Sequence, residues 1–144
     1  MKPVTPDNPL DVFSQTPFMR LLDMKRAFSQ AGHARITLDP SAEVGNVIGA
    51  VHGGVVSTML DVAMASAAVS CVNFTRTVVT LNLTTNFLAP GRGLLTADGH
   101  VLHHDNAVVW CSAKVTDAQG QTIAQAHGSF RFLEHPKPTA TINP

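Results

Sequence analysis

The sequence predicts an α+β fold in which an antiparallel β-sheet is wrapped around one long central helix. The helix is predicted because residues from Gly53 to about Val72 contain no proline and are apolar on nearly every side, as in a buried helix. The sheet is predicted because the flanking segments alternate between polar and apolar residues and are joined by short turns. The chain has 144 residues, and we expect residues 1–144 to form a single domain.

The other elements follow from alternation and from turn residues. Pro17 interrupts the apolar stripe of a first short helix, and Gln30-Ala31-Gly32 predicts a hairpin turn between two short strands. Prolines crowd both ends of the chain and predict mobile tails. The expected elements are a tail over about 1–9, a helix over about 10–22, strands over about 24–29 and 34–38, a loop over 43–52, the central helix over 53–72, strands over about 75–88, 94–103, 107–117 and 122–133, and a tail over about 134–144.

The four strands after the central helix are expected to form a meander, each pairing with the next, because only short turns separate them. Period-two alternation predicts that the first of these strands has one polar face and one more apolar face. The polar face would carry Thr80, Asn82, Thr84 and Asn86, and the other face Leu81, Leu83, Thr85 and Phe87.

Composition excludes several classes of protein. Ten basic residues balance ten acidic ones, so the chain lacks the basic surface of a nucleic-acid-binding protein. Charged residues make up only 14%, which suits a chain that hides surface in an oligomer. Cys71 and Cys111 are too few for a disulfide scaffold or a four-cysteine zinc site, and reduced thiols suit a cytoplasmic location. Polar residues interrupt the longest apolar stretch, 47–72, and the first residues lack an apolar core, so neither a membrane span nor a signal peptide is expected.

The start of the central helix is the first candidate for chemistry. Gly53 and Gly54 open the helix, where backbone N–H groups are unpaired and the helix dipole is positive. Without Cβ atoms, these residues let a ligand carbonyl approach the N–H groups, as in an oxyanion hole. Asn46 in the preceding loop could add a side-chain donor. The alternative is that the glycine pair only lets the chain turn into the helix.

Asp61 is the second candidate, because a carboxylate in an otherwise apolar helix is costly unless it is paired. Burial would raise its pKa, and nearby donors would lower it. A structural Asp61 that bonds to Thr80 or to a neighbouring loop is the alternative. His52, directly before the glycines, could equally be a hydrogen-bonded spacer.

A histidine-rich segment raises the question of a metal. His103 and His104 are adjacent in a predicted strand and would point to opposite faces, so they cannot easily share an ion. We therefore expect no metal site and interpret His104-Asp105-Asn106 as a solvated turn.

Together these motifs resemble the acyl-CoA thioesterases of the hot-dog fold, of the PaaI (phenylacetate-degradation) type. The resemblance spans about residues 45–133. It rests on His52-Gly53-Gly54, Asp61 on the same helix, Thr80, Asn86-Phe87-Leu88-Ala89-Pro90, and the strands 94–101, 115–120 and 124–130.

The resemblance implies hydrolysis of an acyl-CoA thioester to a free acid and CoA, without a cofactor or metal. Asn46 and the Gly53 N–H would hold the thioester carbonyl oxygen, and His52 would brace their loop. Asp61 would attack the carbonyl or activate a water that Thr80 orients. It also implies a homo-oligomer, a dimer or a tetramer, with the helix aspartate and the loop donors supplied by different subunits. The expected substrate-binding residues are Gly54, Met64, Phe87 and Arg92.

Two features leave alternatives open. Relatives often carry a basic residue in the hairpin where this chain has Asp105-Asn106, so CoA phosphate recognition there is in doubt, and Arg92 is a substitute candidate. A hot-dog hydratase or dehydratase is one alternative, although the usual Pro-Gly-His loop is absent before the helix. A non-catalytic acyl-CoA-binding protein is the other, and Asp61 argues against it.

Overall fold

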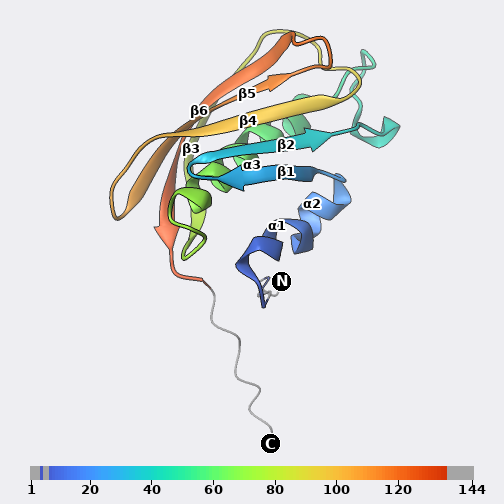
Figure 1. Cartoon of the computed structure of the whole chain (residues 1–144). Helices are drawn as coiled ribbons and strands as arrows, with labels where there is room; N and C mark the ends of the chain where they lie inside the picture. The colour runs from blue at the N-terminus through green and yellow to red at the C-terminus, as the bar shows by residue number, and fades with distance from the viewer. Residues whose placement is uncertain (1–3, 5–6, 136–144) are drawn as a thin grey trace, which may run out of the picture.

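A six-stranded antiparallel sheet curls around one long helix, α3, in the computed structural model (Figure 1). The structure describes Val4 and residues 7–135. Most of the two predicted tails therefore lies outside the described residues, although Pro9 already belongs to a short 3-10 helix. The elements are η1 (Pro9–Asp11), α1 (Val12–Gln15), α2 (Pro17–Leu21), β1 (Lys25–Gln30), β2 (His33–Leu38), η2 (Ala42–Val44), α3 (Gly53–Cys71), β3 (Thr77–Phe87), β4 (Leu95–His104), β5 (Val108–Thr116) and β6 (Thr122–Leu133).

The core lies between α3 and the concave face of the sheet, which confirms the predicted α+β arrangement. Met59, Leu60 and Met64 of α3 are fully buried, as is Phe130 of β6. Gly99 of β4 allows the closest approach, because a Cβ built there would lie 2.4 Å from the carbonyl carbon and oxygen of Ala63. At Gly99 the backbone of β4 therefore lies almost directly against the backbone of α3.

The strand order corrects the predicted meander. The order across the sheet is β1-β2-β4-β5-β6-β3, so β3 pairs with β6 at one edge and does not pair with β4. The segment between β3 and β4 does not form a hairpin because its backbone bonds elsewhere. Leu88 N–H donates to Ile123 O at 2.8 Å, and Gly91 O accepts from Val51 N–H at 2.9 Å. Only β4, β5 and β6 form a meander.

A β-bulge corrects the predicted faces of β3. Thr80 lies opposite Phe130 of β6, but Asn82 lies opposite Ser129, so Leu81 is an extra residue without a partner. Because Phe130 is buried against α3, Thr80 faces α3 as well. Thr80 thus shares a face with Thr85 and Phe87, and the bulge is what turns its hydroxyl towards the helix.

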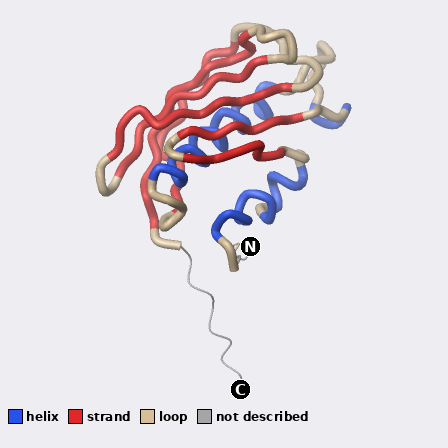
Figure 2. Tube along the Cα trace, viewed as in Figure 1, coloured by secondary structure: helices blue, strands red, loops and turns tan. Residues whose placement is uncertain are grey.

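The N-terminal segment is broken into short pieces where one helix was expected. Pro17 is the first residue of α2, and Thr16 before it is extended, with φ −65° and ψ 120°. The pieces lie on the side of the sheet that holds α3, next to β1 (Figure 2). The predicted hairpin turn is confirmed as Ala31-Gly32, both with positive φ, as a two-residue type I′ turn requires.

By length and hydropathy alone, α3 could cross a membrane, and no other helix among the described residues has this property. Half of that helix is buried inside the protein, however. Its apolar surface is explained by its place in the core.

Candidate active site

His52 caps the amino terminus of α3 and fixes the loop before it. Its Nδ1 accepts a hydrogen bond from Gly54 N–H at 2.9 Å, and its own backbone N–H donates to Val44 O at 2.8 Å. A Cβ at position 54 would lie 3.1 Å from His52 Nδ1, so glycine leaves room for this hydrogen bond. The N–H of Gly54 is thereby engaged within the protein.

The N–H of Gly53 remains available at the same helix end. His52 O accepts from Val55 and Val56, His52 Nδ1 accepts from Gly54, and no described residue accepts from Gly53. The helix dipole adds positive potential there. The ring of Phe87 covers the position, since a Cβ at Gly53 would lie 3.4 Å from Phe87 Cε1. The geometry thus leaves one of the two glycine donors free, beside an aromatic ring.

Asn46 shapes the loop in front of this helix end. Its Oδ1 accepts from Ile48 N–H at 3.1 Å and from Ala50 N–H at 3.0 Å, so only its Nδ2 can serve as an external donor. Asn46, Gly53 and Phe87 line one cavity of about 400 Å³. The structure therefore brings these three predicted site residues together.

Arg92 lies on the other side of the same loop. Its Nη2 donates to Ile48 O at 3.1 Å, and it lines a neighbouring cavity with Asn46 and Gly91. Arg92 is exposed, so its remaining donors face solvent close to the Asn46 loop.

Asp61 and Thr80 form the second part of the site. Thr80 Oγ1 donates to Asp61 Oδ1 at 2.7 Å, which joins α3 to the edge strand β3. Burial raises the pKa of Asp61 above its usual range, and the Thr80 hydrogen bond lowers it in part. A carboxylate that is partly desolvated and held by one donor is suited to act as a base or a nucleophile.

Within one chain the two parts of the site are far apart. Eight residues of α3 separate Gly53 from Asp61, which at about 1.5 Å per residue is roughly 12 Å along the helix. An oxyanion donor and a base that act on one carbonyl must both lie within about 3 Å of it. A single copy cannot place both groups on the same substrate atom.

Met64 does not share the surroundings of the other candidates. Its side chain is fully buried, its Cε lies close to Gly128 of β6, and it lines none of the cavities described for this chain.

One polar group of β3 was not among the predicted site residues. Thr85 Oγ1 is buried on the α3-facing side of β3 and lacks a hydrogen-bond partner among the described residues. Alternation in the sequence places Thr85 on the more apolar face of this strand but does not show that its hydroxyl is buried without a partner.

Other nucleophiles and metal ligands do not compete with Asp61. Burial raises the pKa of the Cys111 thiol to about 12, so its thiolate is scarce at neutral pH. Asp105 accepts from the N–H groups of Ala107 and Val108, as expected for a solvated turn. Within residues 7–135 no group of three potential metal ligands comes together.

Comparison with known proteins identifies the family of the chain. Residues 48–124 match the family model described as the thioesterase superfamily. A protein of Saccharolobus solfataricus named as an esterase is 31% identical over 115 residues, covering 79% of this chain and 81% of its own.

Two solved structures share the fold. The Bacillus halodurans protein BH2602, solved with CoA, has a TM-score of 0.76 and 28% identity, covering 84% of this chain and 81% of its own. The Escherichia coli PaaI protein of the phenylacetic acid degradation operon has a TM-score of 0.80 and 23% identity, covering 88% of this chain and 91% of its own.

Proposed function

The chain belongs to the thioesterase superfamily, and on that basis we propose that it hydrolyses acyl-CoA thioesters to a free acid and CoA. The observation that carries the proposal is the pairing of a free N–H at the start of α3 with a partly desolvated carboxylate on the same helix. The relative solved with CoA supports the choice of a CoA thioester as substrate.

The chemistry needs no group beyond these residues and water. The carbonyl oxygen of the thioester accepts from Gly53 N–H and from Asn46 Nδ2, which stabilise the negative charge that develops there. Asp61 accepts a proton from a water whose oxygen attacks the carbonyl carbon, or attacks that carbon itself to form an anhydride that water then opens. The C–S bond breaks, and the CoA thiolate leaves and takes up a proton.

We infer that each active site is shared between two copies of the chain. Gly53 and Asp61 of one copy are too far apart to act together, so Asp61 of one subunit would meet Gly53 and Asn46 of the other. The edge strand β3 supports this arrangement, because an unpaired strand edge is a template for another strand. Val79 and Leu81 on this strand are 45% and 55% exposed and offer apolar surface that a second copy would cover.

Arg92 is the basic group that we assign to the CoA phosphates. It lies beside the Asn46 loop, and its outward donors are not used by other residues in the described part of the chain. The side chain of Asp105 in the β4–β5 hairpin is a carboxylate, which disfavours a phosphate at that position.

The test is release of CoA thiol from acetyl-, hexanoyl-, phenylacetyl-, benzoyl- and palmitoyl-CoA, measured for the wild-type protein and for Asp61→Asn. We expect turnover of at least one substrate by the wild type and a loss of about 10³-fold or more in Asp61→Asn, because the variant lacks the base or nucleophile. Wild-type turnover by a folded Asp61→Asn variant would refute the role of Asp61. A tight complex without thiol release would favour an acyl-CoA-binding protein, and hydration of crotonyl-CoA would favour a hydratase.

A further inference from the structure

A mostly apolar cavity lies next to Asp61 on α3. It has a volume of about 290 Å³ and lies between α3, β3 and the N-terminal segment, and we call it the distal cavity. Its apolar wall includes Val62 and Val69 of α3, Val78 of β3 and Phe13 of α1. Val62 follows Asp61 directly, and Val78 lies two residues before Thr80, so the cavity adjoins the Asp61–Thr80 pair.

The charges in this cavity are all of one sign. The guanidinium groups of Arg26 and Arg76 line it, together with His135, and no Asp or Glu is among the lining residues. Both arginines are half-buried, and a guanidinium that is partly withdrawn from water gains from a carboxylate partner, which the lining residues do not supply.

Arg76 and His135 are already partly engaged. Arg76 Nη1 donates to Asn106 O at 2.7 Å, and its guanidinium lies 4.1 Å from the centre of the Phe132 ring. His135 Nε2 lies 2.9 Å from Phe74 O.

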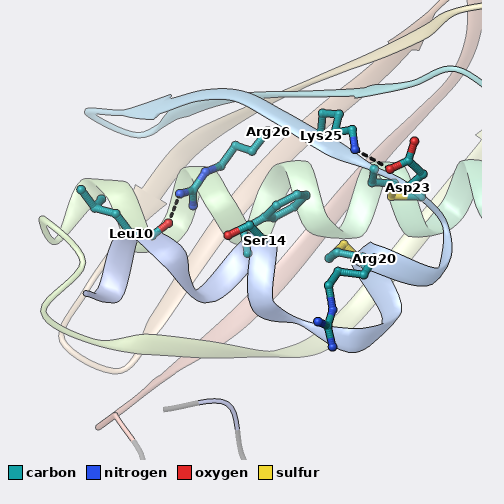
Figure 3. A pocket seen from close by; sticks show the side chains of 9 residues that line it. Leu10, Ser14, Arg20, Asp23, Lys25 and Arg26 are labelled. Atoms are coloured by element: carbon teal, nitrogen blue, oxygen red, sulfur yellow. Dashed lines mark hydrogen bonds and ion pairs between the residues drawn. The ribbon is translucent and has the colours of Figure 1, made fainter. Parts of the chain in front are cut away.

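Arg26, like Arg76, donates a single hydrogen bond within the described part of the chain. It extends from β1 towards the N-terminal segment, where it donates one hydrogen bond to the carbonyl oxygen of Leu10 (Figure 3). The rings of Phe13 and Phe74 lie 5.6 Å and 5.7 Å from its guanidinium carbon. Burial lowers its pKa, which Asp11 raises in part, but no carboxylate of the described residues forms an ion pair with it.

We propose that the distal cavity receives an acyl group whose far end carries a carboxylate, which Arg26 binds. The substrate would then be the monothioester of a medium-length dicarboxylic acid, with its thioester at Asp61 and its free carboxylate at Arg26. This proposal rests on the proposed function for the thioester end only. A guanidinium binds a carboxylate through two parallel hydrogen bonds. An anion is therefore the ligand that best matches the positive charge of Arg26 between the two rings.

The length of the acyl group follows from the helix. The cavity runs along α3 from Val62 to Val69, which at about 1.5 Å per residue is roughly 10 Å, close to the reach of an extended chain of about eight carbons. An apolar cavity of about 150 Å³ holds a benzene ring, so 290 Å³ suits a chain of this size.

The test compares suberoyl-CoA with octanoyl-CoA, which have the same chain length and differ in the terminal carboxylate. The wild-type protein is expected to prefer suberoyl-CoA by about tenfold or more in kcat/KM, the value of a hydrogen-bonded charge pair. Arg26→Gln keeps a donor for Leu10 O but loses the charge, so it should abolish the preference and leave turnover of octanoyl-CoA within a few-fold. Arg20→Gln is the matched control, because Arg20 lies on α2 outside the distal cavity.

Two results would overturn the proposal of a terminal carboxylate: equal or better turnover of octanoyl-CoA by the wild type, or an unchanged preference in Arg26→Gln. Either result would leave the proposed thioesterase function intact. Calorimetric titration with free suberate and free octanoate decides the matter independently of turnover. Suberate binding that is lost in Arg26→Gln and kept in Arg20→Gln would support the site. Absence of suberate binding to the wild-type protein would refute it.

Discussion

The carboxylate of Asp61 is under two opposing influences, burial and the hydrogen bond from Thr80. Burial raises its pKa, and the hydrogen bond favours the ionised form and lowers the pKa. If Asp61 must be ionised to act, activity should be lost on acidification at a higher pH than an ordinary aspartate would give.

Thr80→Val should move this acid limb further upwards. The substitution removes the donor that stabilises the ionised form, so the pKa of Asp61 rises and kcat/KM falls at a higher pH. The measurement is the pH profile of kcat/KM for the wild type, Thr80→Val and Thr80→Ser. The serine variant keeps the hydroxyl and should keep the wild-type limb. An identical limb in all three proteins would mean that Thr80 does not act through Asp61.

Asp61→Asn should not destabilise the protein at neutral pH. A raised pKa means that the folded state binds the Asp61 proton more tightly than the unfolded state, so ionisation above the folded-state pKa costs stability. The amide removes this cost and can still accept from Thr80. Urea denaturation at pH 7 should give a free energy of unfolding at least equal to that of the wild type, and the difference should shrink in acid. A marked loss of stability would make Asp61 a structural residue.

The N–H of Gly53 can be removed with little other change. Proline is favoured at the first position of a helix, and His52 before it is already extended, with φ −59° and ψ 136°. Gly53→Pro should therefore fold and lower kcat by about 10²–10³-fold, the cost of one oxyanion donor. Gly53→Ala keeps the N–H, and its Cβ would meet Phe87 at an ordinary 3.4 Å, so it should stay within a few-fold of wild type. Equal losses in both variants would point to shape rather than to the N–H.

At the scale of elements, the contact of β4 with α3 depends on the absence of a side chain at Gly99. A Cβ there would lie 2.4 Å from the carbonyl of Ala63, and helix backbone cannot yield as a flexible side chain does. Gly99→Ala should lower the free energy of unfolding by about 3 kcal/mol, at the upper end for overpacking. Leu102→Ala on the same strand is the control, because Leu102 is 59% exposed and should change stability little. Equal effects in a denaturation series would contradict this view of the contact.

The sequence predicts elements well where local patterns decide them. The span of α3 and the Ala31-Gly32 turn follow from composition and turn chemistry alone. The position of β3 in the sheet cannot be predicted in this way, because its pairing with β6 is set by hydrogen bonds between loops that are distant in sequence. The bulge at Leu81 is also hidden, since alternation places Thr80 and Phe87 on opposite faces while the structure places them on the same face.

The candidate site shows the same division. His52, Gly53 and Asp61 are recognisable from their spacing on one helix. The sequence does not reveal that His52 engages Gly54 and leaves Gly53 free, nor that Arg26 lies between two rings beside the distal cavity. These details depend on side-chain orientation, which only the packed structure fixes.

At the scale of the whole molecule, the proposed site is shared between two copies of the chain. Gly53 and Asp61 lie roughly 12 Å apart along α3, so in this proposal the donor and the carboxylate that act on one carbonyl come from different subunits. In a two-fold dimer each subunit then contributes Asp61 to one site and Gly53 to the other.

Complementation between two inactive variants tests this most directly. Asp61→Asn and Gly53→Pro are unfolded together, refolded as a mixture and assayed for thiol release from an acyl-CoA that the wild type hydrolyses. Half of the dimers would be mixed, and each mixed dimer would hold one intact site, so activity should return to about a quarter of the wild-type value. Each variant refolded alone should remain inactive. A mixture that stays as inactive as its components, although it forms mixed dimers, would contradict a site shared between subunits.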